Sequence, residues 1–275
     1  MRVALTGANG FVGNHIQEIF DDCVIIERND SEEVILLKLE NVDVVINLAG
    51  APIIKKWSDA YKKVLISSRI DTTRKIVNAI NKSDVKHFIS TSAIGAYPSD
   101  IVCDERHVEY ADDFLGELTK KWEAEANLCE KPTTILRFGV ILGKDGGALS
   151  QMLLPFRLGV GGVIGNGKMM MSWIDIADLM NIYKFIIEKK LTGVFNAVAP
   201  EPISNYTFTK ALGKVLHRPT IFPLPEFVLK LMYGDGATVL TGSKEIYPKA
   251  LLNEGFIFEY PKINLSLDHL LMLRI

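Results

Sequence analysis

The chain has 275 residues, of which 48% are hydrophobic and 23% are charged. This composition is ordinary for a folded protein and excludes an intrinsically disordered chain. The formal net charge is −2, so no overall field would attract nucleic acid or an anionic membrane. We therefore expect neither class of partner.

Other sequence features indicate the cellular compartment and whether a metal is expected. The cysteines Cys23, Cys103 and Cys129 are odd in number and far apart, which is typical of free thiols in a reducing compartment. The five histidines lack metal-ligand spacing, so we expect no metal. The opening "MRVALTG" enters a strand pattern directly, and no apolar run approaches the roughly 18 residues of a membrane helix. A cytoplasmic protein is predicted.

The first half of the chain alternates strand and helix patterns. The expected strands are "RVAL", "CVIIE", "VDVVINLAG", "VKHFISTSA" and "TTILRFGVIL". A long helix is expected from Ser58 to Asn81, with Ser58 as its N-cap. Another helix is expected over 113–126, with an apolar stripe of Leu115, Leu118, Trp122 and Ala126. Continuous apolar strands between helices predict an α/β fold with a doubly wound parallel Rossmann sheet.

The pattern changes after residue 142. Residues 143–171 are rich in glycine and methionine and lack the strand–helix alternation, whereas 172–200 again contain a strand, a helix and the strand "TGVFNAVAP". Residues 201–275 alternate helical patterns with prolines. We therefore expect a dinucleotide-binding domain over 1–142, to which 172–200 return. Residues 143–171 and 201–275 are expected to form a smaller C-terminal α+β domain that binds substrate or acts as a lid.

A glycine motif joins the first strand to the first helix. In "TGANGFVG", Gly7 permits a tight turn, Gly10 lets the main chain approach a pyrophosphate, and Gly13 lets the helix pack on the sheet. The helix N-terminus then faces the phosphates. Because a strand precedes the motif and an acidic residue follows about twenty positions later, the motif predicts dinucleotide binding.

The end of the second strand bears on the choice of cofactor. Glu27 can accept hydrogen bonds from the adenosine ribose hydroxyls, which favours NAD. Arg28 can instead bind the 2′-phosphate of NADP. In the segment "NLAG", small residues at a strand end let a ligand lie across the sheet, which makes Leu48, Ala49 and Gly50 cofactor-binding candidates.

Several motifs together resemble a known superfamily. "TGANGFVG", "NLAGAPI", "SRIDTTR", "STSAIGAY", "KKWEAEA", "WIDIADL" and the tail "YPKALLNEGFIFEYP" are similar to the extended short-chain dehydrogenase/reductases. The likeness is greatest to the atypical branch called "epimerase family protein", among the sugar-nucleotide epimerases and dehydratases. It implies a small C-terminal domain that closes over the nicotinamide, and NADP-type binding in many relatives. The cofactor residues that it implies are Gly7, Gly10, Phe11, Val12, Gly13, Glu27, Arg28, Leu48, Ala49, Arg69 and Val140.

The sequence departs from this pattern at Glu27, at Asp175 and in the catalytic helix. Relatives tend to have a histidine at the position of Asp175, and an aspartate changes the charge beside Trp173. Relatives often carry Ser or Thr at the position of Glu27, and a glutamate there would repel a 2′-phosphate. The superfamily also uses a tyrosine, with a lysine four residues later, as its acid–base pair. The matching positions here are Leu115 and Thr119 when Glu123 is aligned with the glutamate that usually follows the pair. A shifted alignment gives Glu117 and Lys121, which we interpret as a surface pair.

The remaining candidates for catalysis lie elsewhere. Ser92 matches the Ser/Thr that orients a substrate hydroxyl, and Tyr97 is the first replacement candidate for the missing proton donor. Weaker candidates are the acids Asp104, Glu105, Asp175 and Asp178. Trp173, beside a lid-like segment, is expected to bind substrate.

Two functions are left open by the sequence. The first is an NAD(P)-dependent nucleotide-sugar epimerase, or an oxidoreductase that acts on a hydroxyl or carbonyl substrate. The second is a non-catalytic protein that binds NAD(P)(H) as a redox sensor or regulator, which the missing pair favours. The protein is expected to be a monomer or a homodimer, the latter by analogy with superfamily members that dimerise through the helix predicted over 58–81.

Overall fold

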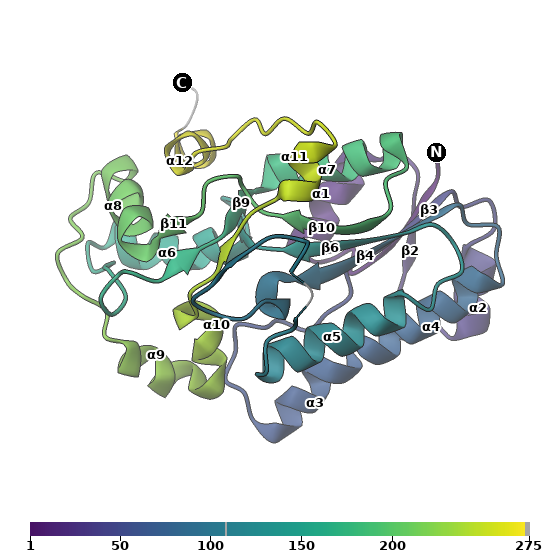
Figure 1. Ribbon diagram of the computed structural model, residues 1–275, viewed down its shortest axis with the longest axis horizontal. Coiled ribbons are helices and arrows are strands. Elements are labelled where there is room, and N and C mark those ends of the chain that lie inside the picture. Colours follow the sequence, from purple (N-terminus) through teal and green to yellow (C-terminus); the bar gives the residue numbers. More distant parts are fainter. Residues whose placement is uncertain (108, 273–275) are drawn as a thin grey trace.

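The computed structural model describes residues 1–107 and 109–272. At its centre lies a six-stranded sheet with the order β10-β6-β4-β3-β1-β2 (Figure 1), and every neighbouring pair in it is parallel. The strands are β1 (Val3–Thr6), β2 (Cys23–Ile26), β3 (Val44–Asn47), β4 (His87–Ala93), β6 (Thr133–Phe138) and β10 (Gly193–Ala197). The predicted α/β fold with a doubly wound parallel sheet is therefore confirmed.

Helices cover both faces of this sheet because alternate strand residues point to opposite sides. Val3 and Leu5 of β1 belong to the larger apolar cluster, whereas Ala4 between them belongs to a second cluster on the other face. Figure 1 shows α1 and α7 on one side of the sheet, and α4 and α5 on the other. The covering helices are α1 (Phe11–Ile19), α2 (Glu32–Lys38), α4 (Ile70–Asn81), α5 (Phe114–Ala126) and α7 (Ile176–Lys189).

The prediction of one long helix from Ser58 to Asn81 is wrong. Ser58 does cap a helix, since its hydroxyl accepts a hydrogen bond from the Tyr61 N–H at 3.2 Å, but this helix, α3, spans only Asp59–Ser67. The next helix, α4, begins at Ile70. Between them the Ser68 hydroxyl donates to the Leu65 carbonyl at 3.2 Å and accepts from the Ala51 N–H at 3.0 Å. Such side-chain bonds compete with the helical backbone pattern and end the helix here.

The later part of the chain returns to the sheet once and otherwise forms short elements. As predicted, the strand within "TGVFNAVAP" joins the sheet as β10, beside β6. The short pairs are β7 (Val140–Leu142) with β9 (Trp173–Asp175), β8 (Met170–Met171) with β11 (Ile203–Ser204), and β5 (Val102–Cys103) with β12 (Glu245–Ile246). The remaining helices are η1 (Ile94–Ala96), α6 (Gly147–Arg157), α8 (Asn205–Val215), α9 (Glu226–Tyr233), η2 (Gly234–Ala237), α10 (Thr238–Thr241), α11 (Lys249–Asn253) and α12 (Ile263–Leu271).

One apolar core connects these later elements to the sheet. Ile16 of α1, Phe208 of α8 and Leu267 of α12 belong to the same buried cluster. The division of the chain into two domains therefore stays a prediction. Among the described residues, no helix is long and apolar enough to cross a membrane, and no three His, Cys, Asp or Glu side chains are grouped as metal ligands.

Candidate functional site

The sheet has its topological switch point between β1 and β3. The chain leaves β1 for β2 on one side and returns to β3 on the other, which opens a crevice at the carboxyl ends of both strands. There the Thr6 hydroxyl donates to the Asn47 side-chain oxygen at 2.8 Å and accepts from the N–H groups of Leu48 and Ala49, at 3.0 and 3.1 Å. This network fixes the loop after β3 to the end of β1.

The glycine loop has the geometry that the sequence predicts. Gly7 has φ +67°, and a Cβ atom there would lie 3.0 Å from the Leu48 carbonyl group. A Cβ on Gly13 would lie 2.3 Å from the Gly7 carbonyl oxygen, so the start of α1 packs directly on the loop. No side chain in the described structure caps α1 at Gly10. The N–H groups of its first turn therefore remain available to an anion in the crevice.

Phe11, the first residue of α1, is held by a second glycine-rich segment. Cβ atoms built on Gly143, Gly146 and Gly147 would lie 2.2, 2.1 and 3.1 Å from its ring atoms. The segment therefore closes over the first turn of α1 only because these side chains are absent. Val12 and Val140 are partly buried and pack against the main apolar cluster.

The side chains of Glu27 and Arg28 are exposed directly after β2. Their backbone is fixed: the Glu27 N–H donates to the Asp30 carboxylate at 2.7 Å, and the Lys75 amine donates to the Arg28 carbonyl at 3.3 Å. Both residues therefore follow the same strand end, β2. Their cofactor roles stay predictions.

Arg69 lies behind the loop after β3. Its guanidinium donates to the carbonyls of Ala51 and Leu65, at 3.0 and 3.3 Å, and lies 5.2 Å from the centre of the Trp122 ring. Burial lowers its pKa to about 10, and among the described residues no carboxylate pairs with it. A Cβ on Gly50 would lie 3.1 Å from the guanidinium carbon. Arg69 therefore supports the loop after β3 from behind.

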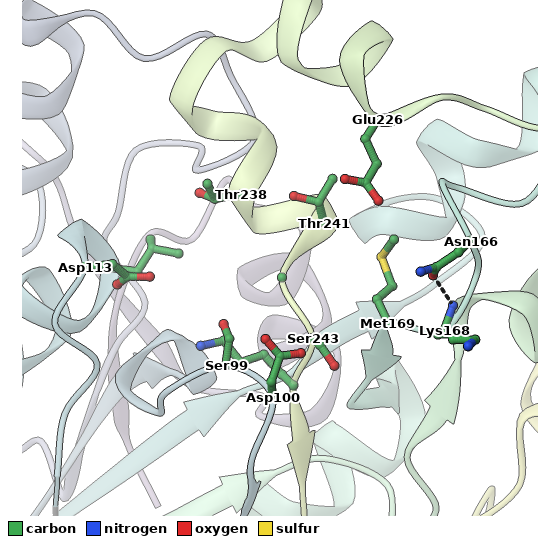
Figure 2. Close-up of a pocket in the computed structure, with 13 residues that line it drawn as sticks. Ser99, Asp100, Asp113, Asn166, Lys168, Met169, Glu226, Thr238, Thr241 and Ser243 are labelled. Carbon is green, nitrogen blue, oxygen red and sulfur yellow. Dashed lines mark hydrogen bonds between the residues drawn. The ribbon is translucent and has the colours of Figure 1, made fainter.

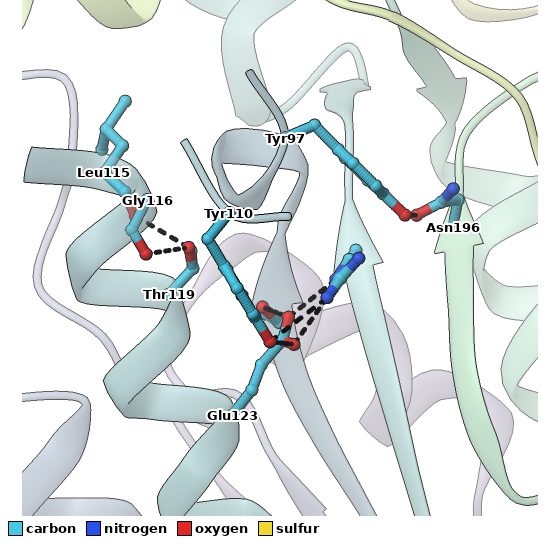
Figure 3. Close-up of polar contacts among 9 residues, drawn as sticks. Tyr97, Tyr110, Leu115, Gly116, Thr119, Glu123 and Asn196 are labelled. Carbon is cyan, nitrogen blue, oxygen red and sulfur yellow. Dashed lines mark hydrogen bonds and ion pairs between the residues drawn. The ribbon is translucent and has the colours of Figure 1, made fainter. Parts of the chain in front are cut away.

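The helix at the position of the superfamily's acid–base helix is α5. Asp113 caps it by accepting from the Gly116 N–H at 2.8 Å. Leu115 is half-buried and Thr119 is buried, with its hydroxyl donating to the Leu115 carbonyl at 2.8 Å (Figure 3). Glu117 and Lys121 form an exposed ion pair at 3.2 Å, which confirms their interpretation as a surface pair. Within the described chain, α5 therefore presents no Tyr–Lys pair.

Ser92 lies at the end of β4 in a buried polar cluster. Its hydroxyl donates to the Glu123 carboxylate at 2.5 Å, and Tyr110 donates to the same carboxylate at 2.6 Å. Arg137 completes the cluster with two hydrogen bonds to that carboxylate, at 2.8 and 2.7 Å. Figure 3 shows the Tyr110 hydroxyl and the Glu123 carboxylate meeting end to end. Ser92 is 1% exposed, so this geometry assigns its hydroxyl to the cluster, and its predicted catalytic role remains untested.

Tyr97 and Trp173, the other predicted site residues, are fully buried. The Tyr97 hydroxyl donates to the Asn196 side-chain oxygen at 2.9 Å, and its ring lies 4.8 Å from the Arg137 guanidinium. Burial raises the pKa of Tyr97, which makes the phenol a weaker acid. The Trp173 indole donates to the Glu201 carbonyl at 3.1 Å. These contacts are structural, and the predicted roles in catalysis and substrate binding remain untested.

The four weaker acid candidates also serve the fold. Asp104 pairs with Arg106 at 2.6 Å, and Glu105 accepts from two backbone N–H groups. Asp175 caps α7 and accepts from the Ser266 hydroxyl at 2.6 Å. Asp178 accepts from the N–H groups of Glu259 and Tyr260. Burial raises the pKa of both Glu105 and Asp178.

A cavity of about 410 Å³ lies between the start of α5 and the elements around α9 and α10. Figure 2 shows side chains from both parts of the chain around it, among them Asp113 on one side and Glu226 with Thr241 on the other. Hydroxyl, carboxylate and amine groups dominate its lining. The lining residues are Ser99, Asp100, Asp113, Leu115, Asn166, Lys168, Met169, Glu226, Thr238, Thr241, Gly242, Ser243 and Lys244.

The cavity brings together residues from distant parts of the sequence. Leu115, at the position of the missing tyrosine, lines it, whereas Ser92, Tyr97 and Trp173 do not belong to its described lining. The sequence predicts no role for Lys244, because "TGSKEIYP" contains no catalytic motif. Only its place directly before the family-like tail could have directed attention to it.

Comparisons with known proteins identify the family of the chain. The model of the "NAD dependent epimerase/dehydratase family" matches residues 3–197. The chain belongs to this family. A second model, named as a domain of unknown function, matches residues 224–270.

Relatives match over almost the whole chain. Epimerase family protein SDR39U1 of Mus musculus is 33% identical over 97% of this chain and 98% of its own length. YfhF of Bacillus subtilis is 31% identical over 98% of both chains. The crystal structure of human SDR39U1 (isoform 2) with NADPH superposes with a TM-score of 0.91 at 30% identity and covers 98% of this chain and 99% of the human one. This likeness confirms the resemblance to short-chain dehydrogenase/reductases.

Proposed function

We propose that the protein binds NAD(P)(H) at the switch point and catalyses oxidation–reduction or epimerisation at a hydroxyl or carbonyl carbon of a small substrate. The observation that carries this proposal is the glycine loop, where Gly7 and Gly13 bring the uncapped start of α1 against the ends of β1 and β3. The human relative with NADPH supports it. The residues present therefore fit a dinucleotide.

Different residues of the chain would bind different parts of the dinucleotide. The first turn of α1 would receive the pyrophosphate, and the loop of Leu48, Ala49 and Gly50 would support the adjacent ribose. When bound, the nicotinamide would supply the acceptor or donor of a hydride. Arg28 would contact a 2′-phosphate, and Glu27 beside it would oppose that contact, so we infer a weaker preference for NADP(H) than Arg28 alone would give.

The cavity supports a polar substrate. Its lining contains four hydroxyl side chains (Ser99, Thr238, Thr241 and Ser243) together with carboxylates and amines. Such a lining suits a molecule with several hydroxyl groups, and a sugar nucleotide is one member of that class. Two observations favour the second function, a cofactor-binding protein without turnover. The Ser92 hydroxyl is buried and donates its hydrogen bond to Glu123, and the Tyr–Lys pair is missing.

One experiment distinguishes the catalytic function from the non-catalytic one. NADPH and NADH are each added to the purified protein, and the melting temperature and nicotinamide fluorescence are recorded. We expect a shift with at least one cofactor; no shift with either rejects both functions. Turnover is then measured with nucleoside-diphosphate sugars and small hydroxy-carbonyl compounds, by nicotinamide absorbance and by product analysis. Cofactor binding without conversion of any compound supports the non-catalytic function.

A further inference from the structure

Lys244 lines the cavity, and hydrogen bonds of both its backbone and its side chain hold it in place. Its backbone N–H donates to the Met170 carbonyl at 2.8 Å, and its own carbonyl accepts from the Ser172 hydroxyl at 2.9 Å. Its side-chain amine donates to the Tyr97 carbonyl, at the end of η1. The same 3₁₀ helix contacts Leu115, since a Cβ on Gly95 would lie 3.3 Å from the Leu115 Cβ. Lys244 and Leu115 therefore flank one short segment and line one cavity.

The amine has hydrogen-bonding capacity left over. A lysine ammonium has three donors, and here one is directed to the Tyr97 carbonyl. Within residues 1–107 and 109–272, no carboxylate lies close enough to form an ion pair with it. Two donors therefore remain for a ligand in the cavity. Leu115 is apolar and has no proton to exchange.

The surroundings of Lys244 favour release of its proton. Burial lowers the pKa of the amine, and this effect outweighs the opposing influence of Asp113, Cys103 and Asp100. These groups come from the start of α5, from β5 and from the loop after η1. Lys168 and Glu226 are the other charged groups that line the cavity. A lysine in such a setting can act as an acid or a base nearer to neutral pH than a free lysine.

We propose that the cavity receives the substrate and that the Lys244 amine, rather than a tyrosine, exchanges the proton with the substrate oxygen. The substrate class is a carbonyl compound, or the matching alcohol, that carries several hydroxyl groups. In the reducing direction, bound NAD(P)H would supply the hydride for the new C–H bond as the carbonyl π bond breaks. The oxygen takes its proton from the Lys244 ammonium, which is later reprotonated from water. The cofactor is oxidised, the substrate is reduced, and the atoms balance.

This inference rests on the proposed function, but one test does not need turnover. The full-length protein is labelled with trace acetic anhydride from neutral to alkaline pH, and acetylation of Lys244 is quantified by mass spectrometry. We expect its titration midpoint to fall clearly below the usual lysine value of about 10.4. A midpoint at or above that value overturns the inference.

The second arm uses Lys244→Met and Lys244→Arg, with Lys120→Met, at an exposed lysine of α5 that is not among the residues lining the cavity, as the control. On any compound that the natural protein converts, both Lys244 variants should lose about 100-fold or more in kcat, with unchanged NADPH affinity. The control should retain activity. Arginine keeps the positive charge but does not release a proton, so an active Lys244→Arg variant overturns proton exchange, as does an active Lys244→Met variant.

The pH profile separates a chemical role from a structural one. In the reducing direction, kcat should fall as the pH rises through the lowered pKa of Lys244, and this limb should be missing from the residual activity of Lys244→Met. A limb that persists in the variant contradicts the inference. If the natural protein converts no compound, the proposed function fails, and the acetylation titration alone decides whether Lys244 has the required acidity.

Discussion

Glu123 and Arg137 form a two-bond ion pair beneath the end of β4, with nitrogen–oxygen distances of 2.8 and 2.7 Å and side chains that are 3% and 8% exposed. Glu123 also accepts the Ser92 and Tyr110 hydroxyls, so its carboxylate is fully used. Tyr110 shows the effect of this environment, since burial and the neighbouring Glu123 carboxylate raise its pKa to about 12. The pair connects α5 to β6.

Removing one partner of this pair should be costly. Glu123→Ala leaves the Arg137 guanidinium buried without a counter-charge, and we expect a loss of about 3–5 kcal/mol in the free energy of unfolding. Urea denaturation followed by circular dichroism measures it. The matched control is Glu117→Ala in the same helix, which breaks an exposed pair and should cost about 0.5 kcal/mol or less. Equal losses in the two variants would contradict the role given to the buried pair.

Thr6→Val should uncouple the loop after β3 from β1. The substitution keeps the side-chain volume but leaves the Asn47 side-chain oxygen and the N–H groups of Leu48 and Ala49 without the Thr6 hydroxyl. We expect a loss of about 1–3 kcal/mol in unfolding free energy, together with weaker NADPH binding. Thr133→Val, which removes a single half-buried hydrogen bond at the start of β6, serves as the control. Unchanged NADPH affinity in Thr6→Val would refute the coupling.

Gly13→Ala tests whether the glycine loop binds the cofactor. The added methyl group would meet the Gly7 carbonyl oxygen at 2.3 Å and force the loop away from α1. We expect NADPH binding to weaken about tenfold or more, a loss of about 1.4 kcal/mol in binding free energy, measured by fluorescence titration. Glu18→Ala, an exposed change on the same helix, should bind as the natural protein does. A Gly13→Ala variant that folds and binds normally would disprove the assignment.

Glu27 and Arg28 should affect cofactor choice in opposite directions. Glu27→Ser removes a negative charge beside the proposed 2′-phosphate position, so the affinity for NADPH relative to NADH should rise. Arg28→Ala should lower the same ratio by removing a phosphate ligand. Parallel titrations with both cofactors give the two ratios. A ratio that does not change in Glu27→Ser would show that Glu27 lies away from the ribose.

Lys244→Met should stabilise the fold, because the natural protein must bury an amine whose pKa burial lowers. Between the lowered folded-state pKa and the unfolded value of about 10.4, the unfolded chain binds more protons, so the natural protein gains stability as the pH rises through this window. The stability advantage of Lys244→Met should therefore be largest below the window and shrink toward its upper end. Urea denaturation at a series of pH values measures this difference. An advantage that grows with pH would contradict the direction of the shift.

The sequence predicted the fold because its signals are local and periodic. The apolar stripe of α5 is an example: Leu118, Trp122 and Ala126 are buried, as their spacing predicts. The glycine loop was equally predictable, since the positive φ of Gly7 is a property that few residues other than glycine tolerate. The break between α3 and α4 was missed because it depends on Ser68 bonding to Ala51, a residue distant in the sequence.

The candidate site could be predicted only in part. The sequence predicts roles for Ser92, at the carboxyl end of a strand, and for Tyr97, in the loop that follows, but the hydrogen-bond partners of their hydroxyl groups are determined only when the chain has folded. Their partners, Glu123 and Asn196, lie 31 and 99 residues away. Lys244 lacks any local motif, and it lines the same cavity as Leu115 because both residues contact the η1 segment from distant parts of the sequence. Contacts between residues that are distant in the sequence produce no periodic pattern, so a single sequence does not predict them.

The closed cluster around Glu123 has a consequence for protein engineering. Substituting Leu115→Tyr and Thr119→Lys would restore the Tyr–Lys pair of the superfamily's catalytic helix, but the Ser92 hydroxyl would still donate to Glu123, which Arg137 holds in place. The double variant would contain the phenol and the ammonium, but Ser92, the third residue of the catalytic set, would still be bound to Glu123. Conversion to a conventional member would therefore require coordinated changes in β4, α5 and β6, which the Glu123 cluster connects.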